Sequence, residues 1–442
     1  MHTINLKPML RKKNASLIFI FITVVLDTMG LGIIIPIIPT LITKLTGQGL
    51  SDASLYGGWL LVSFSFFQFL FAPLLGTLSD RVGRRPVLLV AMFGLGIDYL
   101  IHAYAPTITW LFVGRILAGI TGASYTVANA YVADISKPED KAKNFGMVGA
   151  AFGLGFILGP VIGGFCSRWG VQAPFLISAG LSFLNFLYGL LILPESLPKE
   201  KRREINWLKA NPVGALSHLK KYPMVTGLVV AFFFVHFAAQ SLPSVWVFFT
   251  ELKFSWSEKE VGLSLGVVGL LVAIVQGGLT GVAVKKLGER KTVFLGFLMW
   301  SSGMLLFMLA NSSLMLYIVL IPYCLGGIAG PTLQSIISNQ VPDDQQGELQ
   351  GALTSVMSLS AIVGPPVMTG VFFFFTKDTS PVFAPGAPYG LAALLMLAGW
   401  VLASLYLSKL KKNMPQRHPR LHRGRKDTKY HKNSQLISVN KS

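Results

Sequence analysis

The ten residues Gly76–Arg85, with the sequence GTLSDRVGRR, decide the fold of this chain. They form a densely charged stretch in a protein of which only 13% of the residues are charged. Apolar runs long enough to cross a bilayer lie on both sides of it. Because so many charges are too costly to hold in hydrocarbon, the stretch is expected to form a short loop at a membrane surface. Its excess of arginine predicts the cytoplasmic surface.

The composition indicates the same class of protein. The chain has 442 residues, of which 52% are hydrophobic, and a formal net charge of +19. This predicts an all-α membrane protein that crosses the bilayer many times. The basic residues gather in loops and in the C-terminal tail, as in membrane proteins generally, so the charge does not indicate nucleic-acid binding. Cys166 and Cys324 both lie in apolar stretches, which favours a packing role over a disulfide.

Twelve apolar stretches are long enough to span the bilayer. The first is expected to remain as a span and not to be cleaved as a signal peptide. The predicted spans cover about residues 16–42, 55–75, 86–104, 110–133, 144–166, 173–193, 224–250, 260–284, 292–309, 314–341, 349–375 and 388–408. Lys and Arg concentrate in the even-numbered connections, which places both termini in the cytoplasm.

This pattern divides the chain into two halves of six helices each, with polar segments around them. The predicted units are a cytoplasmic tail (1–14), the first half (15–193), a basic cytoplasmic loop (194–222), the second half (223–409) and a basic tail (410–442). The last segment lacks apolar periodicity and is expected to be disordered. It anchors the chain to anionic lipid or binds a protein partner.

Several landmarks recur at nearly one spacing, which indicates an internal repeat. The pairs are Gly76 and Gly281, Gly83 and Gly288, Pro138 and Pro342, and Gly159 and Gly364, separated by 205, 205, 204 and 205 residues. Such a repeat predicts two parallel six-helix halves with a substrate site between them near the membrane midplane. Rocking of the halves would then expose that site alternately to the two sides. Asp80 becomes Lys285 in the second copy, so the two halves are expected to differ in gating chemistry.

The first copy of the charged stretch is interpreted as a cytoplasmic gate. A carboxylate at a helix end can cap a neighbouring helix and pair with arginine across the interface between the halves. The predicted gate residues are Gly76, Asp80, Arg81, Gly83, Arg84 and Arg85. The alternative is a solvated topology signal, which explains the arginines but neither Asp80 nor the glycines.

Ionisable residues inside predicted spans are functional candidates, because burying an unpaired charge in lipid is costly. Asp27, Asp98 and Arg115 lie deepest in the first half. A carboxylate that alternates between an apolar setting and a nearby arginine can load and release a proton. The alternative is a structural ion pair among these three.

The second half offers fewer such groups. His236 is either a proton carrier or a packed core histidine. Gln240 and Gln276 either line a polar cavity or bond between helices. The aromatic residues, including Trp246 and Trp300, either stack on a bulky substrate or face lipid.

Small residues recur at three- and four-residue spacing in the predicted fifth span. They are Gly155, Gly159, Pro160, Gly163 and Gly164. This spacing permits a close helix approach, and the proline is expected to kink the helix. We expect this packing to seal one side of a transporter.

The sequence holds no GxxxxGK[ST] nucleotide-binding loop, so direct use of ATP is not expected. It also shows neither a Cys/His metal motif nor a recognisable pair of nucleophile and base. We therefore expect no cofactor, no metal site and no enzymatic activity.

Residues 76–86 resemble the cytoplasmic loop motif of the major facilitator superfamily, and residues 155–164 (GFILGPVIGG) resemble the fifth-span motif of its drug/proton antiporters. Further stretches resemble the tetracycline efflux (TetA-type) group of that family: residues 26–32, 97–99, 114–123, 130–135, 254–257 and 345–351. Exporters of that group carry an aspartate where this chain has Trp300 and a histidine where it has Val272. The resemblance therefore implies that proton coupling rests mainly on the first half.

The resulting expectation is a monomeric exporter in the inner membrane, which exchanges protons for an amphipathic small molecule or drug by alternating access. A tetracycline-like substrate is possible. The alternatives are an exporter of an endogenous metabolite such as a siderophore, and a membrane receptor or scaffold that transports nothing.

Overall fold

The computed structural model describes residues 6–122, 124–136, 140–202, 223–341 and 346–413. Within these ranges, twelve segments, each a single helix or two or three joined helices, are long and apolar enough to cross a membrane, which confirms the predicted all-α membrane fold. The predicted loop 194–222, the tail 410–442 and the pair Pro138 and Pro342 lie partly or wholly outside the described residues.

The first half comprises residues 6–192 of the described chain. Its helices are α1 (Leu6–Ile34), η1 (Ile35–Ile37), α2 (Ile38–Thr46), α3 (Leu50–Val82), α4 (Arg84–Tyr104), α5 (Ile108–Thr121), α6 (Ser124–Ile135), α7 (Lys141–Cys166), η3 (Ser167–Trp169) and α8 (Ala173–Ile192). A short turn, η4 (Lys199–Lys201), follows.

The second half begins at Pro223. Its helices are α10 (Pro223–Ala239), α11 (Ser241–Phe254), α12 (Glu258–Ile274), η6 (Val275–Leu279), α13 (Thr280–Leu287), α14 (Glu289–Leu309), α15 (Ser313–Leu325), η7 (Gly326–Ile328), α16 (Ala329–Ser338), α17 (Gln346–Thr376) and α18 (Ala387–Asn413). Helices α4 and α14 have equal length and lie 205 residues apart, as the predicted repeat requires.

The stretch Gly76–Arg85 is helical, which corrects the prediction of a loop. Residues up to Val82 are the last turns of α3, and Arg84 begins α4. Only Gly83 lies between the two helices, and its φ of 109° is open to glycine at little cost. Gly288 takes the same role between α13 and α14, with a φ of 79°. A single residue thus reverses the chain in each half.

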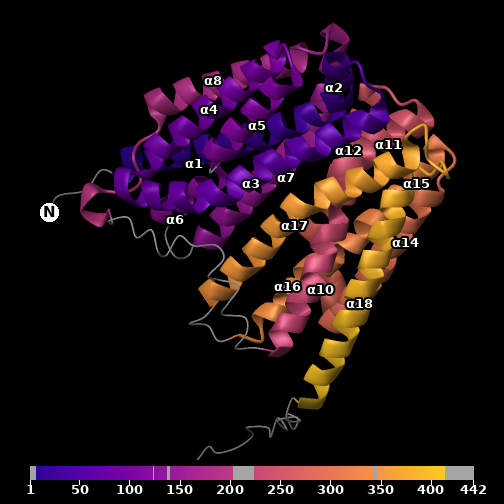
Figure 1. Ribbon diagram of the computed structural model, residues 1–442. Coiled ribbons are helices and arrows are strands. Elements are labelled where there is room, and N and C mark those ends of the chain that lie inside the picture. Colours follow the sequence, from indigo (N-terminus) through magenta and orange to yellow (C-terminus); the bar gives the residue numbers. More distant parts are fainter. Residues whose placement is uncertain (1–5, 123, 137–139, 203–222, 342–345, 414–442) are drawn as a thin grey trace, which may run out of the picture.

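The two halves converge where α2, α11 and α12 lie and diverge toward α6 and α16 (Figure 1). We call the first region the junction end and the second, which carries Gly83 and Gly288, the motif end. Across the junction end, α7 packs on α12 and α3 packs on α17. Thr40 donates a hydrogen bond of 2.8 Å to Glu258 there, and Ser51 donates one of 3.0 Å to the carbonyl oxygen of Thr376.

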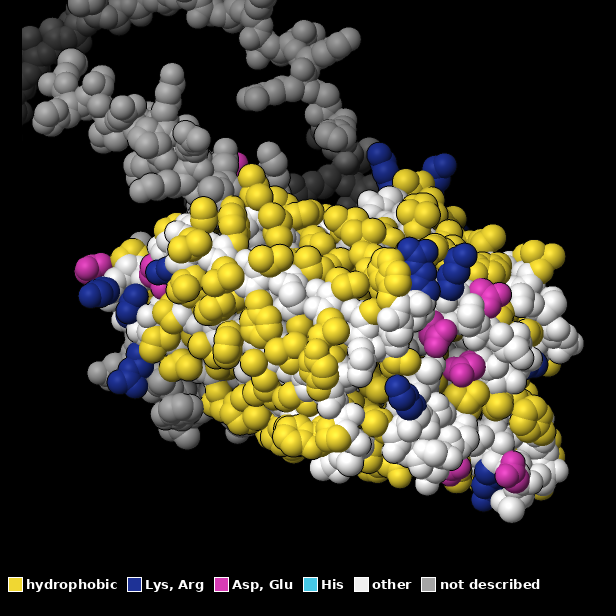
Figure 2. Space-filling view, turned by 90° about the horizontal axis from the view of Figure 1, so that it is seen from above, with side chains coloured by type: hydrophobic (Ala, Val, Ile, Leu, Met, Phe, Trp, Pro, Cys, Tyr) yellow, Lys and Arg dark blue, Asp and Glu magenta, His cyan; other side chains and the backbone are white. Residues whose placement is uncertain are grey.

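The outer surface is suited to lipid. Figure 2 shows a face covered mostly by hydrophobic side chains, with the charged ones gathered toward its two sides. Leu184 and Leu191, both on α8, are 64% and 82% exposed. Exposed apolar residues in such numbers are expected of a protein whose solvent is the bilayer.

Candidate functional site

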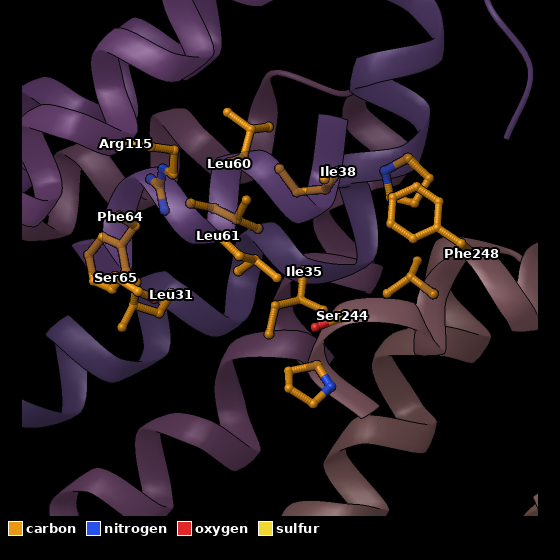
Figure 3. A pocket seen from close by; sticks show the side chains of 15 residues that line it. Leu31, Ile35, Ile38, Leu60, Leu61, Phe64, Ser65, Arg115, Ser244 and Phe248 are labelled. Carbon is orange, nitrogen blue, oxygen red and sulfur yellow. The ribbon is translucent and has the colours of Figure 1, made fainter. Parts of the chain in front are cut away.

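A cavity of about 250 Å³ lies between the halves near the junction end. Helices of the first half form most of its wall, and α11 of the second half closes it. Figure 3 shows Arg115 and Phe64 at one side and Ser244 and Phe248 at the other. Among the described residues that line it, Arg115 carries the charge and the rest are apolar or small. Such a lining suits an amphipathic compound with few polar groups.

Arg115 belongs to a buried ionic cluster that we define as Asp98, His102 and Arg115. Their exposed fractions are 0%, 1% and 7%. The guanidinium of Arg115 donates to Oδ2 of Asp98. Nδ1 of His102 lies 3.1 Å from Oδ1 of Asp98 and 2.9 Å from the Asp98 carbonyl oxygen. The structure therefore brings two of the predicted residues, Asp98 and Arg115, into direct contact.

The sequence reasoning missed His102. The sequence did contain an indication of this residue. His102 follows Asp98 by four positions in a predicted span, and residues four apart on a helix lie on one face. The imidazole stacks on the Phe175 ring of α8, with the ring centroids 5.6 Å apart. The cluster thus joins α4, α5 and α8.

Asp27 of α1 is half-buried. Tyr99 interacts electrostatically with Asp27, Asp98 and Arg115, the three predicted ionisable residues of the first half. Gly30 lies one turn after Asp27. The Tyr99 hydroxyl occupies the space that a side chain at position 30 would fill.

The predicted polar residues of the second half do not gather in this way. Nδ1 of His236 lies 3.0 Å from the Phe232 carbonyl oxygen. Gln240 packs against Gly364 of α17. Gln276 is exposed within the π-helical turn η6. No described contact joins any of the three to the ionic cluster.

Aromatic residues fill the interior of the second half instead. The Phe307 ring lies 5.1, 5.3 and 5.5 Å from the rings of Trp246, Tyr323 and Tyr389. Trp300 packs edge-on against Tyr323, with the ring centroids 6.1 Å apart. Trp300, where the resemblance led us to expect an aspartate, therefore packs against an aromatic core.

At the motif end, Arg84 is the centre of a polar network. Its guanidinium lies 2.6 Å from Asp80, 3.1 Å from Asp134 of α6 and 2.6 Å from the Ser79 hydroxyl. Each of these partners belongs to the first half. A contact of this motif with the second half stays a prediction.

Glu195 completes the network, and the sequence reasoning missed it. Its carboxylate accepts hydrogen bonds from the backbone nitrogens of Arg84, at 2.8 Å, and Arg85, at 3.3 Å. It therefore caps the N-terminus of α4, where the helix dipole favours a negative charge. Gly83 is packed against this carboxylate. Gly76 and Arg81 lie nearby on α3, and Arg81 is exposed.

The small residues of α7 pack on two neighbours. Gly155, Gly159 and Gly163 face the backbone of α1, and a Cβ at Gly159 would lie 2.5 Å from the Met29 carbonyl oxygen. Gly164 and Pro160 face α12 of the second half, where Gly262 meets them. The predicted motif thus holds α7 between its own half and the other.

Comparison with known proteins agrees with this architecture. Residues 20–279 and 234–438 match the model of the Major Facilitator Superfamily. The tetracycline resistance proteins of class C and class E, both of Escherichia coli, are 42% and 40% identical to the chain. The alignments cover 82% and 83% of this chain and 90% of each relative.

Solved structures share the fold. A bacterial homologue of the human lysosomal transporter Spinster, in an inward-facing and occupied conformation, superposes with a TM-score of 0.73 at 16% identity. The match covers 90% of this chain and 98% of that one. The human organic anion transporter MFSD10 gives a TM-score of 0.67 at 24% identity, covering 88% and 99%. The predicted resemblance is confirmed, and this chain belongs to the Major Facilitator Superfamily.

Proposed function

We propose that this protein is a proton-coupled exporter of amphipathic drugs, with tetracycline-type compounds as the first candidates. The observation that carries the proposal is the cavity between the halves, whose charged wall residue Arg115 is paired with the buried Asp98. The resemblance to tetracycline resistance proteins supports the substrate class. Trp300 and Val272, which stand where the resemblance implies an aspartate and a histidine, are the observation in favour of an endogenous-metabolite exporter, but the similar proteins named above do not favour it.

The motif end faces the cytoplasm of a cell whose inner membrane holds the protein. This orientation follows from the arginines of the charged stretch. The contacts between the halves lie at the junction end, so the structure corresponds to a state in which the drug enters from the cytoplasm. One chain forms the whole cavity, which is consistent with action as a monomer.

Export then requires the halves to rock. Closing the motif end brings the network of Asp80, Arg84 and Glu195 toward the second half. Opening the junction end breaks the hydrogen bonds from Thr40 to Glu258 and from Ser51 to Thr376. Asp27 and the ionic cluster bind the exchanged proton, while Gln240 and Gln276 offer polar contacts to the drug along its path.

The test is a drug-susceptibility panel that includes tetracyclines, in a pump-deficient host, with the wild type compared with Asp98→Asn. Asp378→Asn is the matched control, because Asp378 is an exposed acid in a connection at the junction end. Tolerance in the wild type and the control, lost in Asp98→Asn, supports the proposal.

The same proteins in liposomes provide the second measurement. An imposed pH gradient should drive drug accumulation by the wild type. If neither drug tolerance nor gradient-driven movement is found, the proposal fails. Capture of a partner by the basic tail would then favour the receptor or scaffold.

A further inference from the structure

Each member of the ionic cluster has a buried side-chain atom without a described hydrogen-bond partner: Oδ1 of Asp98, Nε2 of His102 and Nε of Arg115. The guanidinium nitrogen cannot accept a proton, whereas the carboxylate and the imidazole can, and the imidazole of His102 is ordinarily the more basic of the two. Its Nδ1 faces two acceptors, the carbonyl oxygen and the carboxylate of Asp98, so Nδ1 carries the hydrogen in the neutral ring. Nε2 is then the basic nitrogen. It is buried and has no hydrogen-bond partner among the described residues. A proton taken up at Nε2 makes the ring a cation beside the Asp98 carboxylate.

The surroundings of the ring limit what can compete for that proton. Asp98 on the same helix faces it, and Arg115 from α5 pairs with the other oxygen of that carboxylate. From α8 it meets the Phe175 ring. Asp27 and Tyr99 form the next layer through the Tyr99 side chain. No described contact brings another charged group from α3, α6 or α8 against the imidazole.

Helix α5 leaves room for this pairing at Gly114. A Cβ at that position would lie 2.6 Å from Cε1 of His102 and 2.7 Å from Oδ1 of Asp98. Any larger residue would push the imidazole and the carboxylate apart. Because residue 114 is glycine, α5 can approach α4 closely while the Asp98 carboxylate and the His102 imidazole both lie against it.

The single negative charge of Asp98 can therefore pair with either of two cations, the Arg115 guanidinium or the protonated His102 imidazole. With His102 neutral, Arg115 is neutralised by Asp98, and the cavity wall is almost uncharged. With His102 protonated, the imidazolium competes for the same carboxylate, and part of the charge of Arg115 faces the cavity uncompensated. An amphipathic cation in that cavity is then repelled, because the electrostatic interaction acts in an apolar setting.

We propose that His102 is a proton-binding residue of the transport cycle, and that its protonation expels a cationic amphipathic drug by releasing Arg115 from Asp98. This inference rests on the proposed drug/proton exchange. The proton binds Nε2 from solvent on the side where the drug leaves, and it departs on the other side as Arg115 pairs with Asp98 again. Proton and drug thereby exclude each other, as exchange requires.

A first experiment does not involve drug. Full-length protein with ¹³C- and ¹⁵N-labelled histidine is titrated by NMR in lipid nanodiscs, and the His102 signals are assigned by their loss in His102→Gln. In Arg115→Gln, His102 should become protonated at a pH about one unit or more above that in the wild type. In Asp98→Asn, it should become protonated at a lower pH than in the wild type. A His102 ring that stays neutral in Arg115→Gln while Asp98 takes the proton overturns the inference.

A second experiment uses binding, so that misfolding of the charge variants does not decide the outcome. The affinity for tetraphenylphosphonium, an amphipathic cation whose charge does not change with pH, is measured at pH 6 and pH 8 for the wild type, His102→Gln and His236→Gln. His236 is the matched histidine, because its Nδ1 also lies 3.0 Å from a carbonyl oxygen one turn earlier.

The wild type and His236→Gln should bind about tenfold more weakly at pH 6, whereas His102→Gln should change less than about twofold. A pH dependence that survives in His102→Gln overturns the inference. If the wild type binds neither this cation nor tetracycline at either pH, the proposed function fails, and the NMR titration still decides the role of His102.

Discussion

Helices α4 and α14 occupy corresponding places in the two halves, yet their interiors differ in kind. Asp98, His102 and Arg115 correspond, at a spacing of 205 residues, to Gly303, Phe307 and Leu320. Among the buried residues that the structure describes, those with acidic, basic or imidazole side chains are Arg84 and the ionic cluster, all in the first half.

The second half uses the same scaffold for an aromatic core. Phe307, at the position that corresponds to His102, is fully buried among Trp246, Tyr323 and Tyr389. Its buried polar residues, within the described chain, are serines and threonines besides the aromatic side chains and Cys324. One backbone arrangement thus supports either a titratable interior or a rigid apolar one. An internal repeat can therefore preserve the packing of its helices while the buried side chains of the two copies diverge in chemistry.

The largest effect is expected when the ionic cluster is made to resemble the second half. Arg115→Leu, which introduces the residue found at position 320, leaves the Asp98 carboxylate buried without its guanidinium. The free energy of unfolding should fall by about 3–5 kcal/mol. The double variant Asp98→Leu with Arg115→Leu should regain most of that stability but not export. Thermal unfolding in detergent and drug tolerance measure the two outcomes, and an unchanged stability of the single variant would contradict this comparison.

The next effect concerns the glycines of α7 and α17. Gly159 faces backbone atoms of α1, whereas Gly364, at the corresponding position, faces the side chain of Gln240. Gly159→Ala forces two helices apart and should reduce export about tenfold or more, at a cost of about 1–3 kcal/mol. Gly364→Ala should reduce export less, because a side chain adjusts more easily than a backbone.

Gly153→Ala is the control for these two variants, because a Cβ at Gly153 meets no described atom within 4 Å. Initial rates of drug uptake into inverted vesicles measure all three variants. Equal losses in Gly159→Ala and Gly364→Ala would show that α7 and α17 are under the same constraint.

A smaller effect is expected at the motif end, where Asp80 corresponds to Lys285. Asp80→Asn removes one ion pair of Arg84, but Asp134 and Ser79 still hold that guanidinium. Stability should change by less than about 1 kcal/mol, because the Asp80 side chain is 41% exposed. Export should fall severalfold if the carboxylate acts in the closed state. Lys285→Asn, at an exposed position, should leave export near the wild-type rate.

The smallest effect is expected at His236. Its ring is held by a backbone carbonyl, and no acidic side chain is described beside it. His236→Gln should raise the KM for drug by no more than about threefold and leave the pH profile of export unchanged, because a glutamine still offers polar contacts. A shifted pH profile would show that a residue of the second half takes part in proton binding, and would contradict the difference between the two halves.

Much of this architecture was predictable from the sequence, because a membrane span is recognised from the hydropathy of about twenty consecutive residues. The charged stretch was located correctly but its conformation was not, since one glycine suffices to turn the chain where a loop was expected. Asp98 and Arg115 were identified by their rarity in apolar segments. Glu195 was missed because its partner Arg84 lies 111 residues away, and only the packing of α8 beside α4 brings the two together.

The contact between α7 and α12 has a mechanical consequence. A Cβ at Gly164 would lie 3.0 Å from Cα of Lys259, and Gly262 meets the backbone of Pro160 and Gly164. Main chain therefore touches main chain at this part of the seam, and farther along α12 the positions of Gly266 and Gly269 receive the side chains of Val161 and Ile157. Because one of the two helices presents glycine at each of these contacts, the helices approach closely, and a change in their crossing angle displaces few side chains. None of the residues that line the cavity belongs to α7 or α12, so substitutions in the cavity wall can change the preferred substrate without altering this contact between the halves.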